Sequence, residues 1–428
     1  MNLLLNDDEA TSTRVQGPEH RPASIEETGV RASVLEDLAL KSLYLSGPFS
    51  VAELGKLTHL SYEVALELFN RLRAKLLCEV TGMVAHLPTM AITSMGRTRA
   101  MELLSQSQYA GAAPVSLKSY VEQVRRQSVR NLRVTRDDVE RAFADFVIDE
   151  KTLSQFGTAL NSGEAIFLYG PPGTGKTSAA ETLAKVLAND AVWIPYAVEI
   201  DGQIIVVFDP TVHKPFPLFE ETHYDKRWVR CRRPTVIAGG ELTMDMLDLQ
   251  FSSSLNYYVG PVQLKANNGT LIIDDFGRQR MTPEELLNRW VVPLDRGIEF
   301  LTLAGGRKIE VPFELMVVFA SNKDPMKLMD PAFLRRIQTK IRIGAVTPQQ
   351  FLEIFRRVAK KHGASVDEDT VYGLITVIRD ELKEDLRACH PRDLIAQVAW
   401  AARYEGRPLK LDSASLMMAV ESYFLART

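Results

Sequence analysis

The sequence predicts a multi-domain protein whose central unit has an α/β fold, with a parallel sheet covered by helices on both faces. Within residues 146–345, short apolar runs typical of buried strands alternate with helical patterns. From Pro348 onward only helical patterns remain, which indicates a helical lid over residues 346–428. Helices and two short strands precede the central unit, so we expect a small N-terminal domain, a core and a lid.

The composition narrows the classes of protein to which the chain can belong. It has 428 residues, a formal net charge of −3, and three cysteines, Cys78, Cys231 and Cys389, with no CxxC pair. This charge gives no overall attraction to nucleic acid or acidic lipid, and these cysteines argue against a disulfide framework or a zinc site. The chain start lacks a basic signal-like region, and no apolar run approaches the ~18 residues of a membrane span. We therefore expect a cytoplasmic protein without a membrane span.

The N-terminal domain is expected over residues 31–112. After a first helical pattern, Ser50 and Glu53 form a capping-box sequence that starts a short second helix. A helix over 61–77 and two short strands over 78–93 follow, and a further helix comes after them. This order resembles a winged-helix domain, and a small helical bundle is the alternative.

The segments on either side of this domain show no apolar stripe. Residues 1–30 are polar, with prolines and mixed charges, and we expect a disordered tail there. Residues 113–145 are predicted to form a basic helical linker, which is either a solvated connecting helix or an interaction surface. Its basic residues include Arg125, Arg126, Arg130, Arg133 and Arg136.

A glycine-rich turn, GPPGTGKTS over residues 170–178, lies between an apolar run and a helical pattern. It fits G-x-x-x-x-G-K-[ST] in the strand–turn–helix context that this phosphate-binding motif requires. Backbone N–H groups of such a loop surround phosphates, Lys176 reaches the outer phosphates and Thr177 takes a position on Mg²⁺. An accidental match is the alternative, and both flanks argue against it. The candidate nucleotide-binding residues are Gly170, Pro171, Pro172, Gly173, Thr174, Gly175, Lys176, Thr177 and Ser178.

A second apolar run, TLII, ends on two acids, Asp274 and Asp275. The carboxyl ends of parallel strands share one edge of a sheet, so these acids are expected to meet the phosphate-binding loop. Asp274 is the candidate metal ligand beside Thr177, holding Mg²⁺ through its hydration shell, and Asp275 is the candidate that orients or deprotonates an attacking water. A core strand that runs into an acidic turn is the alternative.

Three later elements suit the same site. The buried run over 316–321 ends on Asn322, which is suited to fixing a water beside the outermost phosphate. Arg335 and Arg336 follow shortly after, where a neighbouring subunit's nucleotide can be reached. Arg392 lies near the start of a helix in the predicted lid and can swing toward phosphate.

Taken together, these elements resemble the AAA+ ATPases over about residues 146–428. By that resemblance they are Walker A, Walker B with Asp274 and Asp275, sensor 1 at Asn322, an arginine finger at Arg336 or Arg335, and sensor 2 at Arg392. We favour Arg336 as the finger, because the finger of the family generally ends this segment. The resemblance implies a P-loop NTPase αβα core with a helical lid, ATP and Mg²⁺ at their junction, and a homo-oligomeric ring, usually hexameric.

Two departures from the family pattern stand out. Asp275 takes the place of the usual glutamate and is one methylene shorter, so the resemblance predicts slow hydrolysis or a nucleotide-binding scaffold. Asp274 follows Lys176 by 98 residues, a long separation that predicts an insertion over about 190–265.

The insertion has two recognisable parts. Residues 193–208 alternate around Asp201-Gly202 and predict a β-hairpin. Residues 224–233 mix aromatic and basic side chains, either as a grip on a substrate or, more simply, as a packed Trp228 with solvated arginines.

A further hairpin is predicted over residues 300–311, just ahead of the strand that ends on Asn322. With this hairpin, the chain is similar to the branch of MoxR-like chaperones and sigma-factor activators. The GAFTGA loop of the activators is absent from the sequence, which argues against a sigma-factor remodeller.

The sequence leaves three functions open. The first is an ATPase that remodels or assembles a protein partner recruited by the N-terminal domain, and the second is a DNA-binding regulator that uses the winged helix. Glu63 and Glu67 lie in the first half of helix 61–77, where a DNA-reading helix places base and phosphate contacts. Because glutamates repel phosphate, protein contact is favoured over DNA. The third is a scaffold that binds nucleotide and hardly hydrolyses it.

Overall fold

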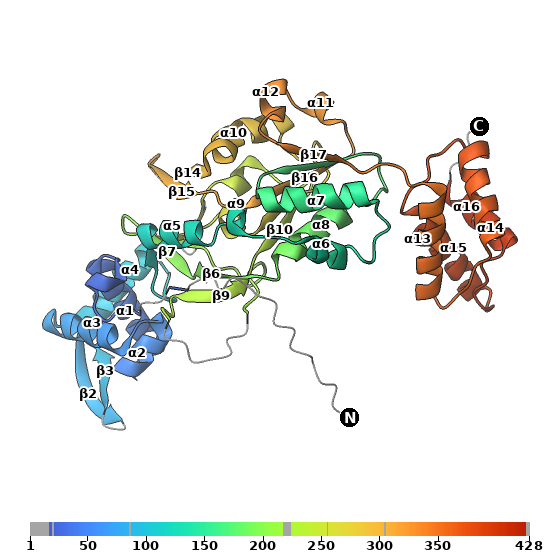
Figure 1. Ribbon diagram of the computed structural model, residues 1–428. Helices are drawn as coiled ribbons and strands as arrows, with labels where there is room; N and C mark the ends of the chain where they lie inside the picture. Colours follow the sequence, from blue (N-terminus) through green and yellow to red (C-terminus); the bar gives the residue numbers. More distant parts are fainter. Residues whose placement is uncertain are drawn as a thin grey trace.

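The structure is a computed structural model that describes residues 17–18, 21–84, 87–216, 224–254, 256–303 and 305–424. It is a mixed α/β protein, with the N-terminal domain at one end, a sheet-containing core in the middle and a helical unit at the other end (Figure 1). The first part of the expected disordered tail lies outside the described residues. Within the described ranges, no helix is both long and apolar enough to cross a membrane.

The N-terminal domain packs helices against a small antiparallel sheet with the strand order β1-β3-β2. Ser50 and Glu53 form the expected capping box at the start of the second helix. Leu38, Leu54 and Leu68 come from three different helices and are buried in a common core. The elements are η1 (Glu26–Thr28), α1 (Ala32–Ser46), β1 (Phe49–Ser50), α2 (Val51–Thr58), α3 (Tyr62–Ala74), β2 (Cys78–Val84), β3 (Leu87–Ile92) and α4 (Ser94–Gln106).

Residues 21–30, expected as part of the disordered tail, instead pack on this domain. Ile25 is buried in the domain core. The hydroxyl of Ser61 donates to the Pro22 carbonyl at 2.7 Å, and the Glu67 carboxylate accepts from the Ile25 N–H at 3.0 Å. The expectation of disorder was wrong for residues 21–30, because the polar composition of a segment does not show whether its few apolar side chains are buried.

The basic linker is also more than a solvated helix. Its six arginines are exposed, but Val115 in β4 (Val115–Ser116) pairs with a strand of the insertion. Tyr120 and Val124, on α5 (Leu117–Arg126), are buried against that insertion. The linker continues through η2 (Val129–Asn131) and α6 (Arg136–Ala142). A stripe of two apolar residues on a basic helix was too short to predict this packing from the sequence.

Five parallel strands build the core sheet in the order β10-β13-β16-β5-β17. All strands run in one direction, so their carboxyl ends share one edge, as the sequence predicts. The strands are β5 (Ile166–Tyr169), β10 (Thr235–Ala238), β13 (Thr270–Ile273), β16 (Met316–Ser321) and β17 (Thr339–Arg342).

Helices cover both faces of this sheet, because alternate strand residues point to opposite sides. Ile166 and Leu168 pack with Leu183 in a cluster that includes α6, α7 (Glu150–Ser162) and α8 (Lys176–Leu187). Phe167 packs on the other face, in a cluster with Trp290. That second cluster includes α10 (Pro283–Arg296) and α12 (Pro331–Leu334), and α11 (Pro325–Leu328) lies next to α12. The core therefore has three layers, α, β and α.

The insertion builds a second sheet in the order β11-β12-β8-β7-β4, with the pair β6–β9 beside it. The predicted hairpin around Asp201-Gly202 is confirmed as the antiparallel pair β7–β8. The predicted bounds of 190–265 are wrong in one respect, because β10 lies inside them and belongs to the core sheet. The elements are β6 (Ala191–Pro195), β7 (Ala197–Ile200), β8 (Gln203–Val206), β9 (Trp228–Arg232), η3 (Met244–Leu247), β11 (Gln250–Ser252), β12 (Tyr257–Val259) and α9 (Val262–Lys265).

The hairpin predicted over 300–311 is confirmed as β14 (Ile298–Thr302) and β15 (Lys308–Pro312). It follows α10 and precedes β16. Phe300 is 44% exposed on it, whereas Leu301 and Val311 are buried against the insertion.

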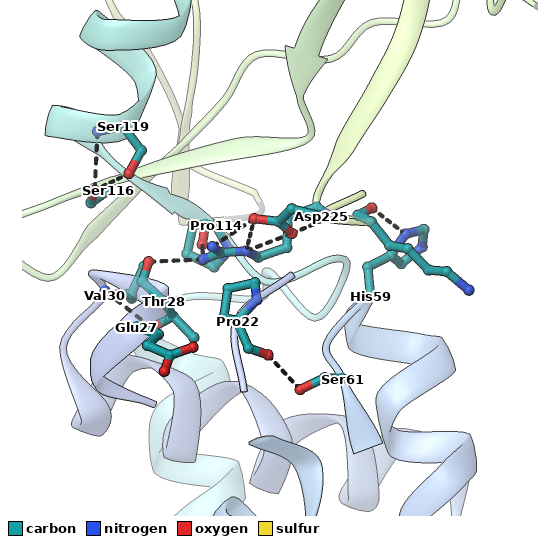
Figure 2. A network of polar contacts seen from close by, with 12 residues as sticks. Pro22, Glu27, Thr28, Val30, His59, Ser61, Pro114, Ser116, Ser119 and Asp225 are labelled. Carbon is teal, nitrogen blue, oxygen red and sulfur yellow. Dashed lines mark hydrogen bonds and ion pairs between the residues drawn. The ribbon is translucent and has the colours of Figure 1, made fainter. Parts of the chain in front are cut away.

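A buried arginine joins the N-terminal domain to the insertion. Its partners Thr28, Pro114 and Asp225 lie close together in Figure 2. Arg227 contacts both carboxylate oxygens of Asp225, and its Nη1 donates to the carbonyls of Thr28 and Pro114 at 3.0 and 3.1 Å. Trp228 is packed as expected, but Arg227 and Arg233 are buried, each with an aspartate partner, instead of solvated. Because these contacts link segments far apart in the sequence, the N-terminal domain is docked firmly on the insertion.

Residues 348–424 form a helical unit in the place expected for the lid, and this unit stands apart from the core sheet in Figure 1. It contacts the glycine-rich loop where the N–H of Cys389 donates to the Gly173 carbonyl at 3.1 Å. Its elements are α13 (Pro348–Lys361), α14 (Glu368–Thr376), the π-helical turn η4 (Val377–Glu381), α15 (His390–Tyr404) and α16 (Ser413–Tyr423).

Candidate functional site

The glycine-rich loop connects the carboxyl end of β5 to the first turn of α8. Gly170 has φ 147°, and a Cβ atom there would lie 2.0 Å from the Ile343 carbonyl oxygen. Gly173 has φ 77°, and a Cβ atom there would lie 2.5 Å from the Cys389 Sγ. Only glycine fits these two positions, so the loop can turn tightly between the sheet and the lid. It ends at Gly175, the N-cap of α8, where the positive end of the helix dipole lies.

Lys176 is the first residue of α8, and only 7% of it is exposed. Its Nζ donates to the Pro171 carbonyl at 2.7 Å. Burial lowers the pKa of Lys176, while the nearby carboxylates of Asp275 and Asp274 act to raise it. A buried ammonium at the start of a helix is placed to bind an anionic group.

Thr177 and Asp274 meet at the same edge of the sheet. The Thr177 hydroxyl lies 3.0 and 3.1 Å from the two carboxylate oxygens of Asp274. Magnesium is usually held by one or two protein oxygens and completes its shell with water and phosphate oxygens. This pair of oxygen donors therefore fits Mg²⁺, and among the described residues no larger cluster of metal-binding side chains competes with it.

Asp275 is the second residue after the strand β13 and has an uncommon backbone conformation. Its φ is +48°, in the left-handed region that Asp and Asn tolerate better than most residues. The Asn322 Nδ2 donates to its Oδ1 at 3.0 Å, and the Arg278 guanidinium lies 4.0 Å from its Oδ2. The structure thus brings together the acid and the amide that the sequence predicts to act on one water.

A cleft of about 500 Å³ opens above these side chains. Residues 172–178 line it, together with Asp274, Asp275 and Asn322, and from the lid Cys389 and Arg392. The loop, the acids and the lid therefore share one cavity, as expected from their positions in the sequence.

The apolar wall of this cleft was missed by the sequence analysis. It includes Phe146 and Ile148 ahead of α7, Ile343 after β17, and Ile354 on α13. In the sequence these residues are recognisable only as hydrophobic, and hydrophobicity alone does not distinguish a residue that lines a cavity from one in an ordinary core. Such a wall suits a planar base, because ligand cavities combine apolar walls with a few polar groups.

Arg392 lies at the mouth of the cleft with its side chain 72% exposed. Its Nε donates to one carboxylate oxygen of Asp393 at 2.9 Å, and the Tyr423 hydroxyl donates to the other at 3.0 Å. The arginine thus lines the cleft and is paired with Asp393 there.

Arg335 and Arg336 do not join this cleft; they line a second pocket of about 380 Å³. The Arg336 Nε donates to Asp295 at 2.9 Å and its Nη1 to the Ala332 carbonyl at 2.8 Å. Arg335 is exposed, and within the described ranges it has no hydrogen-bonding or ion-pair partner. A single chain therefore does not bring these arginines to its own phosphate-binding loop.

Comparisons with known proteins give a partial match and distant likenesses. Residues 347–422, most of the lid, match a family described as a domain of unknown function, DUF8689. Among curated proteins none matches the sequence significantly.

Several solved structures resemble the fold. NtrX from Brucella abortus in complex with ADP is 15% identical, with a TM-score of 0.41, over 68% of this chain and 58% of that chain. The RuvB Holliday junction branch migration motor of Thermotoga maritima is 14% identical, with a TM-score of 0.37, over 64% of this chain and 69% of that chain. Domain III of the T. maritima replication initiation protein DnaA is 12% identical, with a TM-score of 0.38, over 66% of this chain and 97% of that chain. All three are AAA+ P-loop ATPases.

Proposed function

We propose that the protein is an AAA+ ATPase that binds ATP with Mg²⁺ in the 500 Å³ cleft and hydrolyses it. One observation carries the proposal: Lys176, the Thr177–Asp274 pair and the Asp275–Asn322 pair all line this one cleft. Lys176 is a cation that can bind phosphate, and the Thr177–Asp274 pair offers oxygen atoms that can bind a metal ion. The Asp275–Asn322 pair is an acid and an amide that can position a water molecule. They come from three separate segments of the chain, residues 176–177, residues 274–275 and Asn322, so their meeting is not a product of local sequence.

In this proposal each side chain has one task. The loop 170–175 and Lys176 hold the phosphates, and Thr177 with Asp274 would hold the metal, which neutralises phosphate charge when bound. Asp275 orients and accepts a proton from the attacking water, and Asn322 fixes the Asp275 carboxylate through their 3.0 Å hydrogen bond. Asp393 keeps Arg392 at the mouth of the cleft until a phosphate attracts it.

The proposed active form is a homo-oligomeric ring, of which a hexamer is the form suggested by the family resemblance. Arg336 would then act in a neighbour's site as the arginine finger. Asp295 and the Ala332 carbonyl hold its guanidinium at the pocket wall, and a charge fixed in advance stabilises a transition state better than a mobile one. Arg335, which is exposed, would brace the interface.

Mixed oligomers test this shared site. Arg336→Ala and Lys176→Ala subunits should each be inactive alone, with rates about 10³- to 10⁵-fold lower for a lost finger. Mixing them should restore part of the activity, because some interfaces then pair an intact loop with an intact finger. Full activity of Arg336→Ala, or no recovery in oligomers shown to be mixed, would contradict the assignment of this arginine.

The task proposed for the ring is to remodel or assemble a protein partner that the winged-helix-like N-terminal domain recruits. Two features support protein over DNA as the ligand of this domain. Residues 21–25 pack on the first turns of α3 through Ser61 and Glu67, the region a DNA-reading helix would expose. Apolar side chains are also exposed on and beside the β2–β3 hairpin, as on protein-binding surfaces, namely Leu76, Val80, Met83 and Met95.

The alternative, a DNA-binding regulator, predicts tight and sequence-selective DNA binding by the full chain at physiological salt. We expect weak binding at most, lost as salt rises, because phosphate contacts dominate non-specific affinity. Fluorescence anisotropy with labelled duplexes at several salt concentrations separates the two outcomes.

Lys176→Ala tests the assignment of the cleft. The variant should lose ATP binding and turnover while keeping the fold, because the site loses its phosphate-directed cation. Equilibrium binding of a fluorescent ATP analogue measures this directly, and Lys185→Ala, on the same helix, is the control. Unchanged ATP affinity of Lys176→Ala would show that the loop is not a nucleotide site.

A further inference from the structure

The pocket that contains Arg335 and Arg336 also contains an arginine from a distant part of the chain. Its lining includes Arg130, Glu164, Asp295, Arg335, Arg336 and Gln338. Arg130 belongs to the basic segment between the N-terminal domain and the core, for which the proposed function gives no task.

This pocket lies at the edge of the core sheet opposite the phosphate-binding loop. Strands β5 and β17 are parallel neighbours, and Ile166 pairs with Thr339 at their amino ends. Glu164 lies two residues before the start of β5, whereas Gly170 immediately follows its end. With about 3.3 Å per extended residue, the two edges are separated by roughly 15–20 Å. The arginines of this pocket are therefore too far away to contact a phosphate bound in the cleft of the same chain.

The charges in the pocket do not balance. The Arg130 Nη2 lies 3.4 Å from a Glu164 carboxylate oxygen, and Arg336 pairs with Asp295 at 2.9 Å. Arg335 is left over, so three guanidinium groups face two carboxylates. A pocket with this excess of positive charge attracts an anionic group.

Arg130 is held in place by its own surroundings. Its N–H donates to the Ser128 hydroxyl at 3.2 Å, and Val129 beside it is buried. Its aliphatic stem lies against Gly163, where an added Cβ atom would come within 2.8 Å of the Arg130 Cγ. The stem is thus fixed while the charged end, in a side chain 43% exposed, remains accessible.

We propose that Arg130 is a second cation acting in trans, which contacts the phosphates of the nucleotide bound to a neighbouring copy, beside Arg335 and Arg336. This rests on the proposed function, since it requires ATP in the cleft of the neighbouring copy. Docking of that copy places its nucleotide in the pocket, and its phosphate oxygens take the place of Glu164 as the partner of Arg130.

The test compares full-length variants in steady-state hydrolysis at saturating ATP. Arg130→Ala should lower kcat by about 10- to 100-fold, the range for one charge-assisted hydrogen bond in the transition state. Binding of ATP to the same subunit should be unchanged, because its own cleft is intact. Arg133→Ala, an exposed arginine on the same segment that does not line the pocket, is the matched control and should retain the wild-type rate.

Glu164→Gln separates this role from a structural one. It breaks the same ion pair but leaves the Arg130 charge free, so hydrolysis should be kept or increased. An equal loss of activity in Glu164→Gln and Arg130→Ala would mean that the pair only supports the fold, and would overturn the inference. Arg130→Ala subunits should also regain activity when mixed with Lys176→Ala subunits, which supply an intact Arg130; no recovery in mixed oligomers would count against it.

The inference and the proposed function fail in different ways. If the Arg130→Ala variant hydrolyses ATP at the wild-type rate while the Arg336→Ala variant is slower, only the inference is overturned. A wild-type protein that hydrolyses no ATP would overturn the proposed function and the inference with it.

Discussion

At the scale of single residues, the backbone at Asp275 suits a short acidic side chain. The residue follows β13 with φ +48°, where a short carboxylate is tolerated better than a longer side chain. From this position it still reaches Asn322 at 3.0 Å. The shorter acid is therefore consistent with a working site, because the backbone, and not side-chain length alone, sets where the carboxylate lies.

Asp275→Asn tests that role without disturbing the backbone, since Asn tolerates the left-handed region as well as Asp does. We expect ATP binding to be kept and hydrolysis to fall by about 10²- to 10⁴-fold, the usual effect of a positioned base. Single-turnover kinetics measures the chemical step, and Asp245→Asn, on η3 outside the cleft, is the control. Unchanged turnover would place the catalytic acid elsewhere.

At the scale of elements, the start of α15 links the lid to the phosphate-binding loop. His390 is 1% exposed and packs edge-on against the rings of Tyr423 and Phe424 at the end of α16. Burial, assisted by the positive charge of Arg387, lowers the pKa of His390 to about 4. The neighbouring Cys389 contacts Gly173, so the packing of this histidine supports the contact between lid and loop.

Acid should therefore weaken the lid through His390. The histidine is neutral in the folded chain down to about pH 4 but becomes charged in the unfolded chain near pH 6.5. Between these values the unfolded state binds more protons, so stability falls as pH drops from about 6.5 to about 4.

His390→Asn should reduce this pH dependence, because Asn does not titrate. Its side-chain oxygen lies near the position of Nδ1, which accepts from the Arg387 N–H at 3.3 Å. Thermal unfolding at pH 5 and pH 7.5 should show a smaller difference in Tm for the variant than for the wild type. His362→Asn, exposed on the same lid, should leave the difference unchanged. Equal pH dependence in all three proteins would exclude His390 as the cause.

At the scale of the whole molecule, the N-terminal domain and the insertion form a continuous body. Arg227 is 3% exposed and contacts Asp225, the Thr28 carbonyl and the Pro114 carbonyl together. The Ala113 N–H also donates to the Thr58 carbonyl at 2.7 Å. The N-terminal domain is thus connected to the insertion through packed structure instead of a flexible linker.

Arg227→Met tests this connection. It leaves Asp225 buried without its cation, and breaking such a pair costs about 3–5 kcal/mol. Hydrogen exchange should accelerate in residues 25–31 and 113–116, where the domain meets the insertion. Arg232→Met, at an exposed position of β9, should change exchange little. Equal protection in the Arg227 variant and the wild type would show that the domain is docked by other contacts.

The sequence by itself determined the parts of the site that short-range chemistry controls. A loop with glycines at 170, 173 and 175 between a strand and a helix can adopt few other structures. The same holds for the run of three apolar residues, 271–273, that ends on two acids. The hairpins were predictable for the same reason, since alternation around a turn specifies a strand pair locally.

Only the tertiary structure decided which distant segments share an environment. Asp275 and Asn322 are 47 residues apart and meet because β13 and β16 are parallel neighbours. Arg130 joins Arg335 in one pocket, β10 returns from the insertion to the core sheet, and residues 21–30 find a core in the N-terminal domain. Local periodicity tells which side of a segment is buried but not what covers it, because that depends on the order of strands and on the packing of the whole chain.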